Sequence, residues 1–547
     1  MNEVSTFIVG NRKKDLLKNQ PMNRTDNNLT HNFHQPDCNC CGSSHENQPN
    51  EMSRRKFVQL TGTGALGTVA LSGLSWAELV KDSPAGKYDP KRSPLIVKPV
   101  FTYEIPERRE QTSWRSWGGI QTEKGANEEI VSIQGELKTL SSQADFPVSF
   151  LPVSGVRTLD DLSKIEDLKA ADMYLIYPAG GGSNMFDFLN KTGKDIIFFC
   201  RYKSGPVYLW YEIISPRYLR QHTDVLKVNG IDENDVVIDS KDELLWRLRA
   251  LCGLKNTRNS RILAIGGPGA WSQPLEATIK TVTEKYNLDI KNISYEELGG
   301  LITEARSDNS VMTRAKGNAA VYLRDSGIKL ETERKFVENC FVLEDIFIKL
   351  MEKFSCRAIT INNCMGTIMP LAETSACLTL SLLNDAGYLA YCESDFVVVP
   401  AGILLANISG KPSFLNDPTY PHNKTITLAH CTAPRRMDGI NLAPARILTH
   451  FESDYGAAPK VEMLVGQTIT NVMPDFAFKR YVGLAGKITD NPFKDICRSQ
   501  IDISYGCDSR IVAEKMPGFH WITVYGDYMK ETSYALKKIG IEFENLA

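Results

Sequence analysis

Between Arg357 and Leu415, short apolar runs alternate with helical stretches, and this alternation restricts the fold more than any other feature of the sequence. The expected order is strand 358–362, helix 374–384, strand 388–392, helix 396–408 and strand 412–415, with Gly410 ending the second helix. Crossover connections of this kind make the strands parallel. The residues just past the three strands, Asn363, Glu393 and Asp417, should therefore line one sheet edge, where α/β proteins bind ligands.

The same alternation of strands and helices extends upstream. Strands are expected at 95–103, 173–177 and 195–199, and a helix at 123–140, in a first α/β domain that spans 94–257. A second α/β domain, 258–395, opens with a strand from Arg261 and the turn Gly266-Gly267-Pro268-Gly269. A strand-to-helix turn is the favoured interpretation of these glycines, because no complete nucleotide-binding motif is present. Segments 466–470 and 483–488 alternate like hairpin strands and indicate a β domain within 396–547.

Overall charge argues against polyanionic partners. The chain has 63 Lys and Arg against 65 Asp and Glu, a formal charge of −2. No strong field would recruit nucleic acid or an anionic membrane, so a small ligand is expected. Ten of the 13 cysteines lie mostly in or beside apolar runs without framework spacing, which indicates buried thiols and folding in a reducing compartment.

The N-terminus resembles an export signal behind a polar tail. Residues 1–50 have the composition of a disordered segment. A paired-arginine stretch, 53–58, a short apolar run, 62–74, and Ser75-Trp76-Ala77 then follow in the order of a twin-arginine signal peptide. We expect cleavage after Ala77, a linker over 78–93 and a periplasmic mature chain that is not embedded in the membrane. Translation from Met52 is the alternative to Met1, and the Cys- and His-containing tail matches no regular zinc spacing.

Two carboxylates at one sheet edge would repel each other unless a cation lies between them, and a divalent metal is the simplest such cation. Further ligands would come from histidines near the C-terminus. His430 and His520 stand in strand-like contexts, whereas His450 is expected on the surface of a strand and His422 in a loop. A solvated loop carboxylate remains the alternative for Glu393 and Asp417, and a structural histidine for His430.

Three segments resemble the metal-ligand segments of the L-fucose/L-arabinose isomerase superfamily, in the same order and at similar spacing. They are Cys392-Glu393-Ser394-Asp395, Phe414-Leu415-Asn416-Asp417-Pro418-Thr419-Tyr420 and Gly518-Phe519-His520. The resemblance covers 356–547 and is only architectural upstream. It implies two parallel-sheet, Rossmann-like or flavodoxin-like α/β domains followed by a mostly antiparallel, barrel-like β domain, in a trimer or hexamer. It also implies an aldose–ketose isomerase with Glu393, Asp417 and His520 around Mn²⁺, the two carboxylates transferring protons and His430 as a candidate fourth ligand.

The chemistry agrees with this resemblance, because moving a sugar carbonyl between C1 and C2 through a cis-enediol needs a Lewis acid and an acid–base pair. Asn363, Trp117 and Gln121 are candidate substrate-binding residues, the latter two acting in a neighbouring subunit's site, although an aromatic core corner is favoured for the tryptophan segment. The competing hypotheses are an exported sugar-binding protein and an isomerase-like protein without isomerase activity. Because twin-arginine export carries folded proteins, cytoplasmic folding would let the site take Mn²⁺ before Zn²⁺ or Cu²⁺ competes.

Overall fold

The computed structural model describes residues 88–208 and 210–546. The predicted tail, the predicted signal peptide and most of the predicted linker lie outside these residues. Among the described residues, no single helix is long and apolar enough to cross a membrane, and only the bent pair 364–372 and 377–385 passes such a test jointly.

The first sheet is parallel throughout, in the order β2-β1-β4-β5-β6, with β3 paired to the end of β1. Its strands β4 and β5 are almost wholly buried, as expected when helices cover both faces of a parallel sheet. Helix α3 begins at the cap Thr122, whose side chain accepts a hydrogen bond from the Gly125 N–H. The elements are β1 (Leu95–Thr102), α3 (Glu123–Gln143), β2 (Val148–Phe150), β3 (Ser154–Val156), α4 (Leu159–Ser163), η2 (Glu166–Ala170), β4 (Met173–Pro178), α5 (Ser183–Asn190), β5 (Asp195–Cys200), η3 (Trp210–Leu219), η4 (Glu233–Asp235), β6 (Val236–Ile238) and α6 (Lys241–Thr257).

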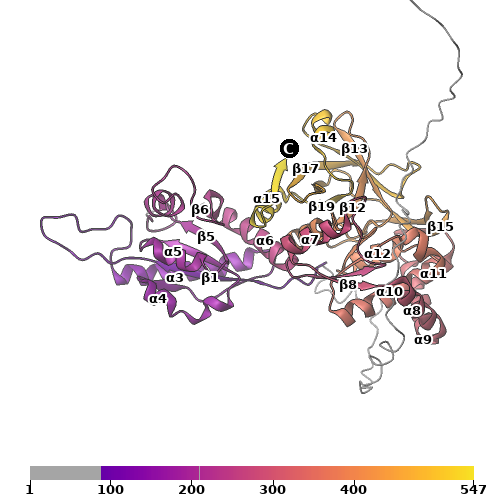
Figure 1. Ribbon diagram of the computed structural model, residues 1–547, viewed down its shortest axis with the longest axis horizontal. Coiled ribbons are helices and arrows are strands. Elements are labelled where there is room, and N and C mark those ends of the chain that lie inside the picture. The colour runs from indigo at the N-terminus through magenta and orange to yellow at the C-terminus, as the bar shows by residue number, and fades with distance from the viewer. Residues whose placement is uncertain (1–87, 209, 547) are drawn as a thin grey trace, which may run out of the picture. The chain divides into compact units, whose positions relative to one another are not determined.

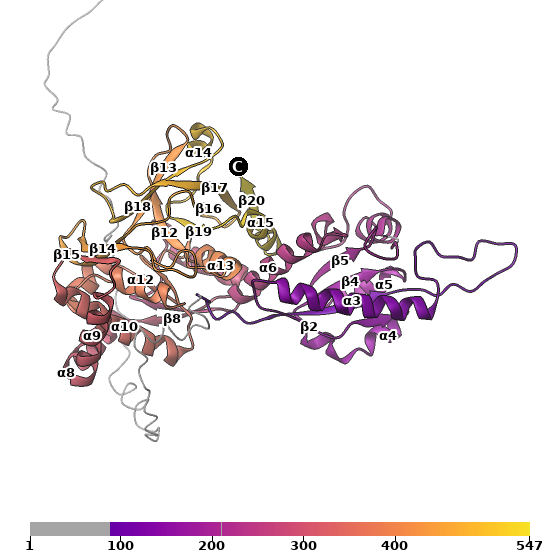
Figure 2. The same cartoon turned by 180° about the vertical axis from the view of Figure 1, so that it is seen from behind.

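The second sheet is also parallel and has the order β11-β10-β7-β8. The chain order reverses between β7 and β10, the point at which open α/β sheets bind ligands beyond their carboxyl ends. Helices α8, α9 and α10 pack together on one side of it (Figure 1, Figure 2). The elements are β7 (Arg261–Ile265), α7 (Leu275–Tyr286), β8 (Asp289–Ile293), α8 (Tyr295–Ser307), α9 (Asn309–Tyr322), β9 (Ile328–Leu330), α10 (Arg334–Phe354), β10 (Ala358–Ile361), η5 (Cys364–Ile368), α11 (Met369–Ala372), α12 (Cys377–Asp385), β11 (Leu389–Tyr391) and α13 (Val399–Ser409).

The strand after α13 departs from the predicted βαβαβ unit. Strand β12 (Phe414–Pro418) does not join the parallel sheet but pairs antiparallel with β13 (Thr425–His430) and β19 (Trp521–Tyr525). Gly410 does end α13, in the left-handed conformation that glycine tolerates best. Asp417 therefore does not share a sheet edge with Asn363 and Glu393, and that geometric prediction is wrong.

The C-terminal strands close into an antiparallel barrel. The ring runs β16-β19-β12-β13-β18-β17 and closes through the pairing of β16 with β17, while β20 adds to β17 from outside. Closure leaves these six strands without a free edge. The α/β and antiparallel barrel classes predicted from sequence are thus confirmed. The remaining elements are β14 (Ala445–His450), β15 (Tyr455–Val461), β16 (Thr468–Pro474), β17 (Arg480–Asp490), β18 (Ser499–Ser504), α14 (Ser509–Lys515), α15 (Met529–Lys538) and β20 (Glu542–Asn545).

Candidate metal centre

A strained turn positions Glu393 directly after β11. Glu393 and Ser394 both have left-handed backbones, with φ of 65° and 48°, a conformation that costs a non-glycine residue about 1–3 kcal/mol. The turn is held by Gly269, whose N–H donates to the Ser394 carbonyl at 2.9 Å and whose carbonyl accepts from Phe396 N at 3.1 Å. A side chain at Gly269 would lie 3.3 Å from the Ser394 carbonyl oxygen. The glycine turn after β7 is thus used to anchor the turn that presents Glu393.

His520 lies just before β19 and faces two carboxylates. Its Nε2 atom is 3.1 Å from Glu393 Oε2 and 3.3 Å from Asp417 Oδ1. Its Nδ1 atom is 2.8 Å from Asp395 Oδ2, and both side chains are buried. A carboxylate on one imidazole nitrogen fixes the ring so that the other nitrogen points at a metal. The arrangement therefore directs Nε2 of His520 toward the space between Glu393 and Asp417.

His430 approaches the same carboxylate from the end of β13. Its Nε2 atom lies 3.5 Å from Glu393 Oε1, and its Nδ1 atom lies 3.1 Å from the hydroxyl of Thr432. Glu393, His430 and His520 each offer one ligand atom, and these atoms lie within 4.8 Å of one another. The structure thus gathers Glu393, Asp417, His520 and His430, the set predicted from sequence, although the strand that carries Asp417 belongs to the barrel.

Three buried polar atoms of this group, Asp417 Oδ1, His430 Nε2 and His520 Nε2, make no well-aligned hydrogen bond among the described residues, although each faces another candidate ligand at 3.1–3.5 Å. Without a proton or a cation between them, such facing lone pairs would be left unsatisfied, at a cost of about 1–3 kcal/mol each. All three belong to candidate ligands, and carboxylate and imidazole together suit divalent metals such as Mn²⁺, Fe²⁺ and Zn²⁺. The residues present can therefore hold a divalent metal ion.

The electrostatics of the cluster favour positive charge at its centre. Burial acts to lower the pKa of His520, but the charge of Glu393 and the hydrogen bond to Asp395 outweigh it and raise the pKa well above its usual value. Burial acts to raise the pKa of Glu393, but His520 and His430 hold it below its usual range. Burial raises the pKa of Asp417. The carboxylates thus attract a cation into a mostly buried site, where Glu393 and Asp417 keep 16% and 24% of their side-chain surfaces exposed.

An aromatic pair stands beside the cluster, and the sequence interpretation did not assign it a role. The rings of Trp271 and Phe519 stack with centroids 3.8 Å apart, and Trp271 meets His520 edge-on at 5.6 Å. Trp271 sits in the loop after β7, four residues before α7, and remains partly exposed. Its position follows from the docking of the glycine turn, which local sequence patterns do not reveal. A partly exposed indole face beside a polar cluster is suited to stacking on a sugar.

The candidate substrate residues are not brought to the cluster by any contact among the described residues. Asn363 is exposed, and its amide reaches Thr367. Trp117 is 73% exposed. Gln121 donates its amide hydrogens to the carbonyls of Ser116 and Gly118 within its own loop. Their roles in substrate binding stay predictions.

The two other C-terminal histidines, His422 and His450, differ in how far they are exposed. His422 lies in an exposed turn, as predicted. His450 was predicted on a strand surface, but it ends β14 with only 5% of its surface exposed. The prediction for His450 is wrong because tertiary packing, rather than strand alternation, buries this end of β14.

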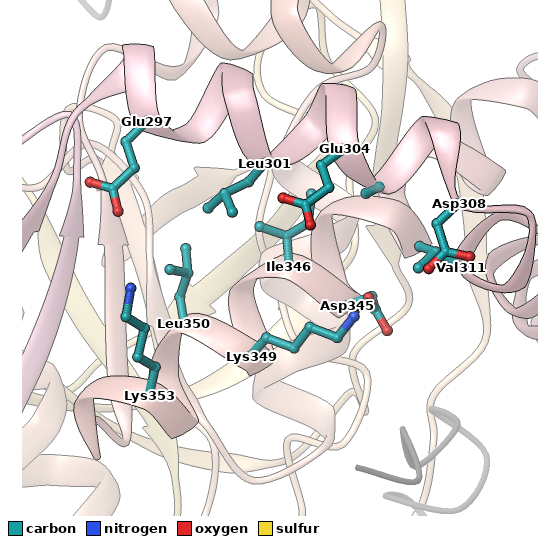
Figure 3. A pocket seen from close by; sticks show the side chains of 11 residues that line it. Glu297, Leu301, Glu304, Asp308, Val311, Asp345, Ile346, Lys349, Leu350 and Lys353 are labelled. Atoms are coloured by element: carbon teal, nitrogen blue, oxygen red, sulfur yellow. Dashed lines mark ion pairs between the residues drawn. The ribbon is translucent and has the colours of Figure 1, made fainter. Parts of the chain in front are cut away.

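A separate hollow of about 220 Å³ opens between α8 and α10. Figure 3 shows Glu297 and Glu304 of α8 facing Lys349 and Lys353 of α10 across an apolar floor. Its lining includes none of the candidate metal ligands. Lys349 pairs with Asp345 one turn away on the same helix, and this mixture of charged rim and apolar floor is that of two packed amphipathic helices.

Comparison with known proteins identifies no family. No family model matches the chain, and no curated protein matches it. One solved structure that it resembles is an ABC transporter periplasmic solute-binding protein from Actinobacillus succinogenes 130z with bound D-allose. The identity is 13%, the match covers 58% of this chain and 92% of that chain, and the TM-score is 0.15. A likeness this low carries no argument about function.

Proposed function

We propose that the protein is a metal-dependent aldose–ketose isomerase of the L-fucose/L-arabinose isomerase type. The observation that carries the proposal is the convergence of Glu393, Asp417, His430 and His520 on one mostly buried point, where their ligand atoms face one another at 3.1–3.5 Å. The donor set suits Mn²⁺, the ion that the resemblance implies. The bound metal would polarise the two substrate oxygens at C1 and C2.

The carboxylates would move the protons. In the conversion, the hydrogen at C2 of an open-chain aldose leaves as a proton, a cis-enediol forms, and a proton is delivered to C1. Glu393 and Asp417 are the two carboxylates at the site and would act as the acid–base pair. Asp395 would hold His520 in place throughout, since it contacts Nδ1 and not the reacting centre. Trp271 would stack on the sugar and limit water access.

The decisive experiment is turnover by the purified protein loaded with Mn²⁺. A panel of aldoses is incubated in D₂O, and NMR is used to detect ketose and deuterium at C2. Glu393→Gln and Asp417→Asn should each lower kcat by about 10²–10⁴-fold. Asp502→Asn is the matched control, because that carboxylate bonds Thr427 elsewhere in the barrel. Tight metal binding without ketose or exchange for any sugar would overturn the isomerase proposal and leave an isomerase-like protein without this activity.

The proposal also covers the protein's export from the cytoplasm and its oligomeric state. The paired-arginine segment supports export of the folded protein to the periplasm by the twin-arginine translocase. The resemblance supports a homo-oligomer, trimer or hexamer, which light scattering of the purified protein would test. Mainly zinc at the Glu393 site of protein purified from the cell envelope would contradict loading with Mn²⁺ before export.

A further inference from the structure

A second group of metal-ligating side chains lies close to the Glu393 cluster. Cys377 opens α12, Cys431 follows β13, and His450 ends β14. All three side chains are buried, and each offers one ligand atom within 4.8 Å of the others. Four elements distant in sequence thus deliver thiols and an imidazole to one point, because Cys497, just before β18, packs there as well.

The spacing of these three ligand atoms is close to that in a tetrahedral metal site. With Zn–S near 2.3 Å and Zn–N near 2.0–2.1 Å, neighbouring ligand atoms in such a site lie about 3.5–3.8 Å apart. Because the ligand atoms of Cys377, Cys431 and His450 lie within 4.8 Å of one another, movements of at most about 1 Å would bring them to this spacing. Ser453 Oγ lies 3.4 Å from His450 Nδ1, where a hydroxyl can help orient the ring.

Cys497 is the candidate for a fourth ligand, because it packs against this buried group. The Cys431 thiol interacts with both Cys377 and Cys497. Ala458 is the other side chain of this small buried cluster. Three thiols and one imidazole are the ligand set of Cys₃His structural zinc sites. The buried thiols Cys364 and Cys392 differ, since their sulfurs lie 3.5 Å apart but no third ligand joins them among the described residues.

We propose that Cys377, Cys431 and His450, completed by Cys497, form a structural site for a thiophilic divalent cation such as Zn²⁺. Binding would exchange the three thiol protons, which go to solvent, for three metal–sulfur bonds, with no change of oxidation state. Thiolates favour zinc, whereas the carboxylate-rich Glu393 site accepts Mn²⁺. The two sites would therefore take different ions.

The cation would stiffen the segment that presents His430. Cys431 is the next residue in the chain, and β13 pairs with β18, which begins two residues after Cys497. Tying Cys431 and Cys497 to α12 and β14 would fix the end of β13. The role is structural, because three thiolates and the His450 imidazole together fill the four positions of a tetrahedral site and leave none for a substrate.

Cobalt spectroscopy tests the proposal directly. The full chain, with the tail residues Cys38, Cys40 and Cys41 changed to serine in every sample, is reduced, stripped of metal and titrated with Co²⁺. We expect thiolate-to-cobalt charge-transfer absorption and the strong visible bands of tetrahedral cobalt, saturating at one equivalent and abolished by one equivalent of Zn²⁺. Absence of these bands at saturating Co²⁺, or a Cys377–Cys431 disulfide in non-reducing mass spectra, would overturn the proposal.

Single-residue variants show which side chains bind the cobalt that gives these bands. Cys431→Ser should lose the charge-transfer bands, whereas the matched control Cys364→Ser should keep them. His520→Ala should also keep them, because the Glu393 site contains no thiol, so failure of either site is distinguishable from failure of the other. Should Cys431→Ser not fold, the titration of the parent protein still decides the question. Persistence of the bands in a folded Cys431→Ser variant would place the cobalt elsewhere and contradict the proposed ligand set.

Discussion

At the scale of single residues, Asp395 is the side chain whose role is most clearly defined by geometry. It contacts His520 Nδ1 at 2.8 Å and lies on the side of the ring away from Glu393. Asp395→Asn should therefore weaken Mn²⁺ binding about 10–100-fold, as removal of such an orienting carboxylate does elsewhere. Metal competition titration measures the effect, with Asp502→Asn as control. Unchanged affinity in Asp395→Asn would show that the imidazole is oriented by other contacts.

Trp271 should contribute to sugar binding and not to metal binding. Its ring stacks on Phe519 beside His520 and is partly exposed. Loss of an aromatic stacking contact is worth about 0.5–1.5 kcal/mol, so Trp271→Ala should raise KM for an active sugar by about 2–10-fold. Mn²⁺ affinity should not change. Equal loss of metal binding and of sugar binding would indicate collapse of the loop after β7 rather than a lost stacking contact.

Sequence reasoning found the candidate ligands but not the residues that arrange them. Glu393, Asp417 and His520 stand in recognisable motifs, and the histidine-poor chain left few other candidates. Asp395 lies inside one of those motifs, yet its contact with His520 spans 125 positions and leaves no local pattern. Asn363 does follow β10 at the carboxyl end of the parallel sheet, as predicted, but its left-handed backbone (φ 48°) accompanies an exposed side chain whose amide reaches Thr367.

At the scale of elements, helix α10 carries a buried acid that makes stability depend on pH. Glu344 is 2% exposed, one of its carboxylate oxygens has no partner among the described residues, and burial together with Asp345 raises its pKa to about 8. Its ordinary pKa is 4.5, so between these values the folded state binds more protons than the unfolded state. The free energy of unfolding should therefore fall as pH rises from about 5 to 8, by up to a few kcal/mol.

Glu344→Gln should remove most of that decline, because the amide cannot ionise. Melting temperatures at a series of pH values compare it with Glu352→Gln, on an exposed position of the same helix. Parallel pH profiles for the parent and Glu344→Gln would show that this carboxyl does not govern the decline.

The glycine turn after β7 and a glycine in α9 should respond oppositely to alanine. Gly266 has φ of 74°, and a Cβ there would lie 2.3 Å from the Tyr295 ring. Gly317 is helical, with nothing within 4 Å of an added Cβ. Gly266→Ala should cost at least about 2 kcal/mol, whereas Gly317→Ala should stabilise by about 0.5–1 kcal/mol. Chemical denaturation measures both, and stabilisation by Gly266→Ala would contradict the packing of this turn.

The positions of helices and strands were predicted better than the pairing of the strands in sheets. The alternation of strands and helices placed β10, α12, β11, α13 and β12 within a few residues. The parallel pairing of β12 was an extrapolation from that alternation, and it failed because β12 finds antiparallel partners more than 100 residues later in β19 and nearby in β13. A buried apolar strand is compatible with either sheet, so its local sequence cannot decide between them.

At the scale of the whole molecule, the candidate site joins parts that fold around different sheets. Glu393 follows the second parallel sheet, whereas Asp417, His430 and His520 come from the barrel or its edge. The hydrophobic cores also cross this junction, since buried residues of β7, β10 and β11 share clusters with buried residues of the barrel. An ion at the Glu393 site would therefore tie the sheet to the barrel and stabilise the folded state as a whole.

Thermal unfolding with and without metal tests this coupling. An ion that binds only the folded state stabilises it by about 2.7 kcal/mol at a hundred times its Kd. Mn²⁺ added to protein stripped by chelation should therefore raise Tm by several degrees, whereas His520→Ala should show little response to Mn²⁺. If the Cys431 site also binds as proposed, His520→Ala should still be stabilised by Zn²⁺, and Cys431→Ser should respond to Mn²⁺ but less to Zn²⁺. Equal shifts with Mn²⁺ in the parent and in His520→Ala would show that the ion acts elsewhere and that the Glu393 cluster does not join the two parts.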